Sequence, residues 1–232
     1  MIRAFYNASA GTVWSQKGLD VTANNIANVS TDGYKAQNAT FSDLLCTNMR
    51  GTEETNLKSG HGSKVNKTDT LFEQGSLKPT GRDLDYALNK DGFFAIQTPE
   101  GIKYTRNGNF SLSEQADGSF ALVAFQGGKV LDANGQPITV TDSAGDLNIG
   151  VYVFQNKNAL QREGNTLFSA GEFPGEAVVD EEPGLLKGYL EASSVDLAEQ
   201  MSAMITDQRS FGINVKMVQM ADSVMETLNN LR

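Results

Sequence analysis

Cysteine and histidine are almost absent from this chain, whose 232 residues contain one of each, Cys46 and His61. A single cysteine excludes a disulfide within the chain. A metal site built on several histidine or cysteine ligands is excluded as well. A Ser-His-Asp or Cys-His arrangement would have to use His61, and its surroundings, residues 59–63 (SGHGS), are typical of a flexible loop that holds a base poorly in position. We therefore expect no enzymatic activity, no cofactor and no metal.

Long apolar runs and an excess of positive charge are also missing. The longest wholly apolar run, Phe120–Phe125, has six residues, whereas a membrane helix needs about 20. Near the N-terminus, Asn7 and Ser9 stand where a cleaved secretion signal would have an apolar block. The net charge is −9, from 19 basic and 28 acidic residues. This acidic balance disfavours nucleic acid and anionic lipid as partners, so we expect no nucleic-acid binding. Because the apolar runs are short, we also expect no membrane insertion and no cleaved signal.

Proline is absent and glycine is rare at both ends of the chain. All five prolines and 20 of the 23 glycines lie between residues 30 and 193. This middle zone contains short runs of β-branched and aromatic residues, such as Phe93–Ile96 and Ile102–Thr105, separated by turn sequences. Short strands at this spacing predict an antiparallel, sandwich-like or barrel-like β-domain over residues 67–182.

The C-terminal zone carries a heptad pattern that predicts a long helix. Asp196 can cap its start, with Glu199 as the capping-box partner. The pattern covers about 30 residues, or roughly 45 Å of helix. The apolar seam, interrupted by two polar residues, consists of Leu197, Met201, Met204, Gln208, Phe211, Val215, Val218, Asp222 and Met225, followed one turn later by Leu228.

The N-terminal zone repeats this pattern more weakly. Its stripe runs from Phe5 to Val29, contains several small or polar residues, and is ended by the turn dipeptide Asp32-Gly33. Such a helix is marginal in water without a partner. We therefore expect an α+β fold in which the two end helices pair as an axial coiled-coil-like domain, with an antiparallel all-β domain inserted between them in the sequence.

The expected boundaries follow from these zones. Residues 1–33 form the N-terminal axial helix and residues 34–66 an extended linker, with one short apolar anchor at Phe41–Leu45. The β-rich domain at residues 67–182 comes next. Residues 183–232 form a return segment and the C-terminal axial helix, which pairs with residues 1–33.

The two apolar stripes admit two interpretations. Exposed stripes of this size mark association sites, and head-to-tail contacts that do not close generate a helical filament. The other interpretation is a monomer whose terminal helices pack on its own sheet. Spacing alone does not separate a polymerising subunit from such a monomer.

Three sequence blocks resemble a known family. Residues 23–35 (ANNIANVSTDGYK), residues 104–110 (YTRNGNF) and residues 188–201 (GYLEASSVDLAEQM) resemble motifs of the bacterial flagellar basal-body rod and hook proteins, in that family's order. Residues 74–77 and 92–94 are similar to further motifs of its β-domain. The resemblance covers nearly the whole chain.

The resemblance implies an axial subunit of the flagellum. Members of the family place paired terminal helices in an inner tube with the β-domain outside it, and are exported through the flagellar type III channel without a cleaved signal. The implied partners are other copies of the chain, other rod or hook subunits and the export apparatus. The chain has room for a single β-domain, which favours a rod subunit, distal or proximal, over a hook or hook-junction subunit.

The candidate functional residues are those expected at the assembly interface. The asparagines near residue 25 can bond to neighbouring helices and set register, or they can bond locally to their own backbone. We expect both chain ends to become ordered only when copies stack. The interface residues are Asn24, Asn25, Ile26, Asn28, Thr31, Gly33, Tyr34, Leu197, Met201, Met204, Ile205, Gln208, Phe211, Val215, Val218, Met225 and Leu228.

The acidic clusters do not predict catalysis. A glycosidase needs two carboxylates in a cleft with separated pKa values, and neither residues 180–182 nor Asp83 with Asp85 gives a sign of this, so we interpret both as solvated turns. In residues 132–135 the glycine falls at the fourth position and not the sixth of a calcium loop, which predicts a hairpin turn. Cys46 is expected to be a small buried apolar residue.

Overall fold

A computed structural model gives the fold of the chain. It divides into two compact units, which we call the helical unit and the β unit. The helical unit comprises residues 1–27, 37–71 and 196–232, and the β unit comprises residues 28–36 and 72–195, so the backbone passes between them four times. The structure describes residues 2–43, 47–48, 58–60, 63–115, 118–140, 147–171, 175, 177–180 and 182–231.

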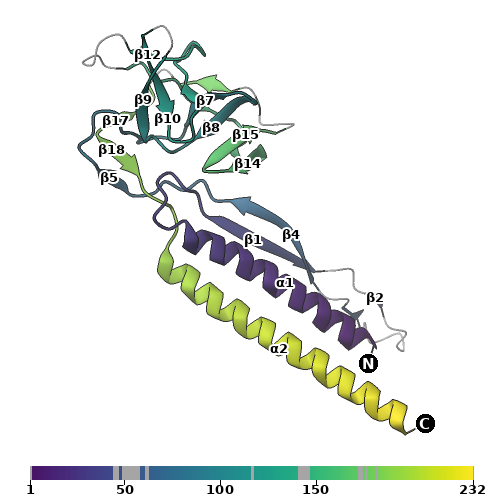
Figure 1. The fold of residues 1–232 in the computed structure, drawn as a ribbon. Coiled ribbons are helices and arrows are strands. Elements are labelled where there is room, and N and C mark those ends of the chain that lie inside the picture. The colour runs from purple at the N-terminus through teal and green to yellow at the C-terminus, as the bar shows by residue number, and fades with distance from the viewer. Residues whose placement is uncertain are drawn as a thin grey trace. The chain divides into compact units, whose positions relative to one another are not determined.

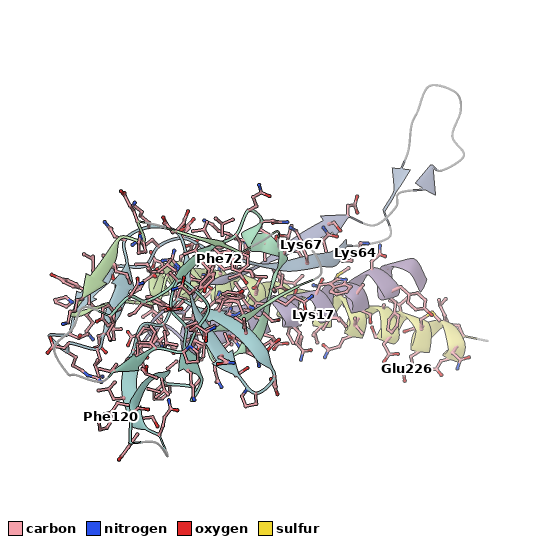
Figure 2. All side chains as sticks on the ribbon, turned by 90° about the horizontal axis from the view of Figure 1, so that it is seen from above. Lys17, Lys64, Lys67, Phe72, Phe120 and Glu226 are labelled. Carbon is pink, nitrogen blue, oxygen red and sulfur yellow. The ribbon has the colours of Figure 1, made fainter. Side chains whose placement is uncertain are left out.

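The helical unit contains both chain ends. Helix α1 (Ile2–Ala27) lies beside α2 (Leu197–Asn230), and α1 also contacts strands β1 (Gln37–Asp43) and β4 (Ser63–Thr70) (Figure 1). Figure 2 shows the side chains of these elements and labels Lys17 on α1 and Glu226 near the end of α2. As the sequence predicts, Asp196 caps α2, and its Oδ1 accepts hydrogen bonds from the backbone N–H groups of the first turn.

The segment expected as an extended linker contains paired strands. β1 and β4 form an antiparallel pair with an irregularity after Thr40, and the short strands β2 (Thr47–Asn48) and β3 (Lys58–Ser59) form another. Of the predicted apolar anchor, Phe41 is about half exposed, while Leu44 and Leu45 lie outside the described residues. The expectations for Cys46 and His61 fall outside them too.

The β unit is built from antiparallel strands among the residues described. Its main sheet follows the order β12-β10-β11-β7-β8-β15-β14, with β13 also paired to β7, β16 to β13 and β9 to β10. Two small sheets, β17 with β6 and β18 with β5, complete it. The strands are β5 (Leu77–Pro79), β6 (Tyr86–Leu88), β7 (Phe93–Thr98), β8 (Gly101–Thr105), β9 (Phe110–Glu114), β10 (Phe120–Ala124), β11 (Lys129–Val130), β12 (Thr139–Val140), β13 (Val151–Val153), β14 (Leu160–Gly164), β15 (Leu167–Ala170), β16 (Val178–Val179), β17 (Leu185–Lys187) and β18 (Tyr189–Glu191), with a 3-10 turn at Lys157–Ala159.

Strand β7 lies at the centre of the core. Because successive side chains of a strand point to opposite faces, Phe94 and Ile96 pack in one apolar cluster while Phe93 and Ala95 pack in another. All four are buried, which explains the continuous apolar run in the sequence. The predicted fold class, α+β with end helices and an antiparallel β-domain between them, is confirmed.

Candidate functional site

Two glycines of α1 face two polar residues of α2. A Cβ atom placed on Gly11 would lie 2.8 Å from Asn214 Nδ2, and one placed on Gly18 would lie 2.8 Å from Asp207 Oδ2. Burial raises the pKa of the Asp207 carboxyl above its ordinary value. The absent side chains of the two glycines therefore give room for polar groups between the helices.

Asn25 makes the third contact of this kind. Its Nδ2 donates to Gln200 Oε1 at 2.9 Å and to the backbone oxygen of Gln37 at 2.8 Å, and its Oδ1 accepts from the Gln37 N–H at 2.9 Å. The three contacts step by seven residues along each helix, in opposite directions. The helices are thus antiparallel, and polar groups occupy the heptad positions where they meet.

The face of α2 that meets α1 is displaced from the predicted apolar seam. Gln200, Asp207 and Asn214 make the contacts described above, and none belongs to that seam. Among the predicted interface residues of α2, the partly buried ones are Met204, Phe211, Val215 and Val218. The exposed ones are Leu197, Met201, Ile205, Gln208, Met225 and Leu228.

The asparagine motif continues past the end of α1 into the β unit. Asn24 is exposed, while Ile26 is partly buried. Asn28 and Thr31, both partly buried, bond to each other locally, through Thr31 Oγ1 to Asn28 Oδ1 at 3.2 Å and Thr31 N–H to the Asn28 carbonyl at 3.1 Å. Asn28 thus makes the local contact that its position near a helix end allows.

Gly33 and Tyr34 are buried in the β unit. The Gly33 N–H donates to the Glu191 carbonyl at 2.7 Å, and its φ of +70° lies in the left-handed region. A Cβ there would lie 2.5 Å from the Asn107 backbone nitrogen. The Arg162 guanidinium lies 4.4 Å from the centre of the Tyr34 ring, so both residues serve contacts within the chain.

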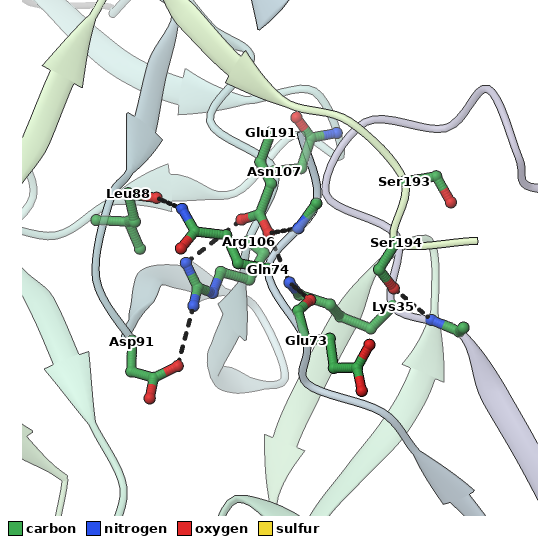
Figure 3. A network of polar contacts seen from close by, with 12 residues as sticks. Lys35, Glu73, Gln74, Leu88, Asp91, Arg106, Asn107, Glu191, Ser193 and Ser194 are labelled. Carbon is green, nitrogen blue, oxygen red and sulfur yellow. Dashed lines mark hydrogen bonds and ion pairs between the residues drawn. The ribbon is translucent and has the colours of Figure 1, made fainter. Parts of the chain in front are cut away.

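A buried ionic network follows directly after this motif (Figure 3). Lys35 Nζ lies 2.6 Å from Glu191 Oε1, with both side chains almost wholly inaccessible, and also donates to the Glu73 carbonyl at 2.6 Å. Glu191 Oε1 accepts from the Gly75 N–H at 2.9 Å. Burial is the main cause that lowers the pKa of Lys35, and Glu191 opposes it.

Arg106 extends the network on the other side of Glu191. Its Nη1 lies 3.3 Å from Glu191 Oε2, and its Nη2 lies 3.7 Å from Asp91 Oδ1. Lys157 Nζ, 2.6 Å from Asp91 Oδ2, lowers the pKa of that carboxyl by a hydrogen bond. The network therefore joins the segment that enters the β unit to the strand from which the chain leaves it.

No role was expected for the residues of this network, although the sequence contained a signal for them. Lys35, Arg106 and Glu191 each stand in one of the three blocks that resemble the flagellar family. The three blocks thus each contribute one residue to the same buried cluster. The spacing of motifs along one sequence does not show which of their residues come into contact.

The acidic clusters are structural in the residues described. Asp180 Oδ1 accepts from the Glu182 N–H in an exposed turn, and Asp85 is buried with Arg82 Nη1 3.5 Å from its Oδ1. Asp132 Oδ1 accepts from the backbone of Asn134 and Gln136, which closes the predicted hairpin turn. Those bonds lower the pKa of Asp132. Asp85 is thus not a solvated turn residue, contrary to our expectation.

Two further findings apply to the described part of the chain. It holds no group of three or more histidine, cysteine, aspartate or glutamate residues placed to bind a metal ion. Neither helix, over its described length, combines the length and apolarity that crossing a bilayer requires.

Comparison with family models gives three matches in separate parts of the chain. A model described as "Flagella basal body rod protein" matches residues 5–35, and one described as "Flagellar hook protein FlgE/F/G D1 domain" matches residues 87–152. A third, "Flagellar basal body rod FlgEFG protein C-terminal", matches residues 186–231.

Individual proteins are similar over the same span. The flagellar basal-body rod protein FlgG of Bacillus subtilis is 33% identical, with 100% of both chains covered. FlgG of Borreliella burgdorferi is 32% identical, over 100% of this chain and 99% of its own. The rod protein FlgF of Mesorhizobium japonicum is 30% identical, over 90% of this chain and 88% of its own.

Proposed function

This chain belongs to the flagellar basal-body rod protein family, and we propose that it polymerises through its terminal helices into the tube that forms the axis of the rod. It is a structural subunit of that rod, from a family of structural proteins and not of enzymes. One observation supports polymerisation above others: α2 has 34 residues and none of them is buried. A helix with so many exposed apolar side chains indicates an association surface.

The paired helices would form an axial, coiled-coil-like domain. Polar residues at heptad positions lower stability but fix register, and the contacts at Gly11, Gly18 and Asn25 recur at that spacing. Such a pair leaves most of the apolar surface of α2 for other copies.

The interface would use the exposed and partly buried residues already placed on α1 and α2. Leu197, Met201 and Ile205 offer apolar surface directly. Asn25 and Tyr34 are buried within the chain, so their contribution would be to hold the helix pair and the segment after α1 in the shape that neighbours meet.

The location and partners follow from the same assignment. The chain is a component of the flagellar basal body. We propose that its neighbours are further copies and other rod or hook subunits, and that the flagellar type III apparatus exports it into the periplasmic or cell-wall zone of the envelope.

Removal of residues 197–232 tests the proposal. These residues belong to the helical unit, so the truncated chain should keep a folded β unit, seen as retained strand signal in circular dichroism. It should neither form sedimenting polymers nor support motility when it replaces the full chain. Rods assembled from the truncated chain would refute polymerisation through α2.

The alternative is a hook or hook-junction subunit. The family-model match over residues 87–152 carries a hook protein in its description, but the similar proteins named above are rod proteins. Imaging of tagged protein in intact cells distinguishes the two, because a rod subunit lies within the envelope and a hook subunit outside it.

A further inference from the structure

Apart from Met225, which lies on the same side of the helix as Asp207, the large apolar residues of α2 that are most exposed lie on two different flanks. We call Leu197, Met201 and Ile205 the N-terminal stripe; these side chains are 42–54% exposed. The C-terminal stripe is 42–79% exposed and consists of Ile213, Met217, Met220, Val224, Leu228 and Leu231. At about 100° per residue, the N-terminal stripe lies roughly 120° to one side of Asp207, which faces α1, and the C-terminal stripe roughly 100° to the other side.

Each flank has exposed apolar side chains in only one half of the helix. On the flank of the N-terminal stripe, the C-terminal half of α2 carries Gln219, Asp222 and Glu226, all exposed. On the opposite flank, the N-terminal half carries the small or polar residues Ala203, Thr206 and Ser210. Neither stripe can therefore serve as one continuous seam along α2. The helix instead presents two separate surfaces that face in different directions.

The C-terminal stripe also continues past the end of α1. In the antiparallel register set by Gly11 and Gly18, the beginning of α1 lies opposite about Ser223. By this register the last two turns of α2 extend beyond α1, and Figure 1 shows α2 projecting past the start of α1. Leu228 and Leu231 are about half and four-fifths exposed there. No described element of this chain covers the projecting turns, although their aliphatic side chains favour burial.

The symmetry of a rod restricts what can cover these two surfaces. A contact in which a patch meets its own copy across a two-fold axis closes after two chains, whereas a contact between two different patches can continue indefinitely. A subunit that polymerises needs the second kind, and α2 presents two apolar patches on different flanks and at different heights.

We propose that the C-terminal stripe of one copy packs against the N-terminal stripe of a neighbouring copy. The occupant of each surface is a second copy of this chain, and the contact is heterologous. This inference rests on the proposed function and deepens it, because it says which two parts of α2 meet.

Cross-linking of single-cysteine variants of the full chain tests the contact. In a Cys46→Ser background, Met201→Cys and Met220→Cys are assembled alone and as an equal mixture, then treated with a short bismaleimide. We expect a cross-linked dimer from the mixture and none from either variant alone. Asp222→Cys is the matched control, since it lies near Met220 but on the other flank, and it should give no dimer with Met201→Cys.

Each other outcome decides against the inference. A dimer from either variant alone shows a stripe that meets its own copy. Polymers that sediment but give no dimer from the mixture overturn this contact and leave the proposed function standing. If the parent chain forms no polymer, the proposed function fails and the contact falls with it.

Charge substitution gives a second, independent measurement. Met201→Lys or Met220→Glu alone should reduce sedimenting polymer by about tenfold or more, because each buries an unpaired charge. The chain with both substitutions places Lys against Glu at every contact and should recover assembly, whereas Met201→Lys with Met220→Lys should not. Equal assembly by the two double variants would contradict the contact, and unchanged circular dichroism checks folding.

Discussion

At the scale of single residues, the fold of the β unit depends on a few residues whose backbone conformation or buried charge makes substitution costly. Gly33 combines a positive φ with a close approach to the Asn107 backbone, and Lys35 keeps an ammonium group inside the unit by pairing with Glu191. A buried ion pair contributes little net stability, but loss of one partner leaves an uncompensated charge. The segment that follows α1 is therefore constrained by both its backbone and its charges.

Substitution of Gly33 should be costly for two separable reasons. Gly33→Ala is expected to lower the free energy of unfolding of the β unit by about 2 kcal/mol or more, because a left-handed residue costs 1–2 kcal/mol and the clash adds to it. Gly81→Ala is the control, since Gly81 has φ +71° and open space around its Cβ. Urea unfolding measures both, and equal losses would show that the approach to Asn107 costs nothing.

Asp207 should make the helix pair sensitive to pH. Its pKa is raised in the folded chain by burial, so its contribution to stability is greatest below the unfolded pKa and is lost as pH rises through the folded pKa. Asp207→Asn should therefore stabilise α1 and α2 at neutral pH and flatten their dependence on pH over the acidic range. Thermal melts of helical circular dichroism measure this, with the exposed Asp222→Asn as control. A steeper pH dependence in Asp207→Asn would contradict it.

At the scale of elements, α2 and its cap were predicted from the sequence, but the polar residues by which α2 meets α1, Gln200, Asp207 and Asn214, lie outside the predicted seam. The heptad count followed apolar residues, because burial of apolar surface usually decides helix packing. Here Gly11 and Gly18 leave room opposite Asn214 and Asp207. A search for apolar side chains gives glycine no weight, so it does not detect this kind of helix contact. The pairing of β1 with β4 was missed because their polar composition lacks the alternation that marks a strand.

The strands of the β unit were easier to predict. Phe93–Ile96 and Ile102–Thr105 lie in β7 and β8, as their composition and the turn between them indicate. The ionic network could not be predicted from spacing, because Lys35 and Glu191 are 156 residues apart. Its members were visible only as parts of motifs whose spatial relation the sequence does not give.

Glycine positions in the two helices should respond in opposite ways. Gly18→Val fills the space that Asp207 occupies, and the resulting strain should lower the stability of the helix pair by about 1–3 kcal/mol. Gly212→Ala meets nothing within 4 Å and should raise helix stability by about 1 kcal/mol through backbone propensity. Helical melts of the two variants measure the difference, and a stabilising Gly18→Val would exclude close packing at that point.

At the scale of the whole molecule, the two units should differ in stability. The β unit has two apolar clusters, whereas α2 has no buried residue. Local stability follows buried apolar contacts, so the helices should gain most of their order from neighbours in the polymer.

Hydrogen exchange of the isolated full chain measures this directly. Amides before residue 30 and after residue 195 should exchange rapidly in the monomer and become protected in the polymer, while strands such as β7 stay protected in both. Slow exchange at both ends of a monodisperse monomer would contradict folding coupled to assembly.

The four passages of the backbone between the units have a mechanical consequence. A domain joined to a shaft by one flexible peptide can rotate freely relative to that shaft. The shaft would then transmit little torque to the domain. Four crossings, at residues 27–28, 36–37, 71–72 and 195–196, cannot complete a full revolution without winding around one another. In the polymer that we propose, torque applied to the helices would therefore be shared among four backbones.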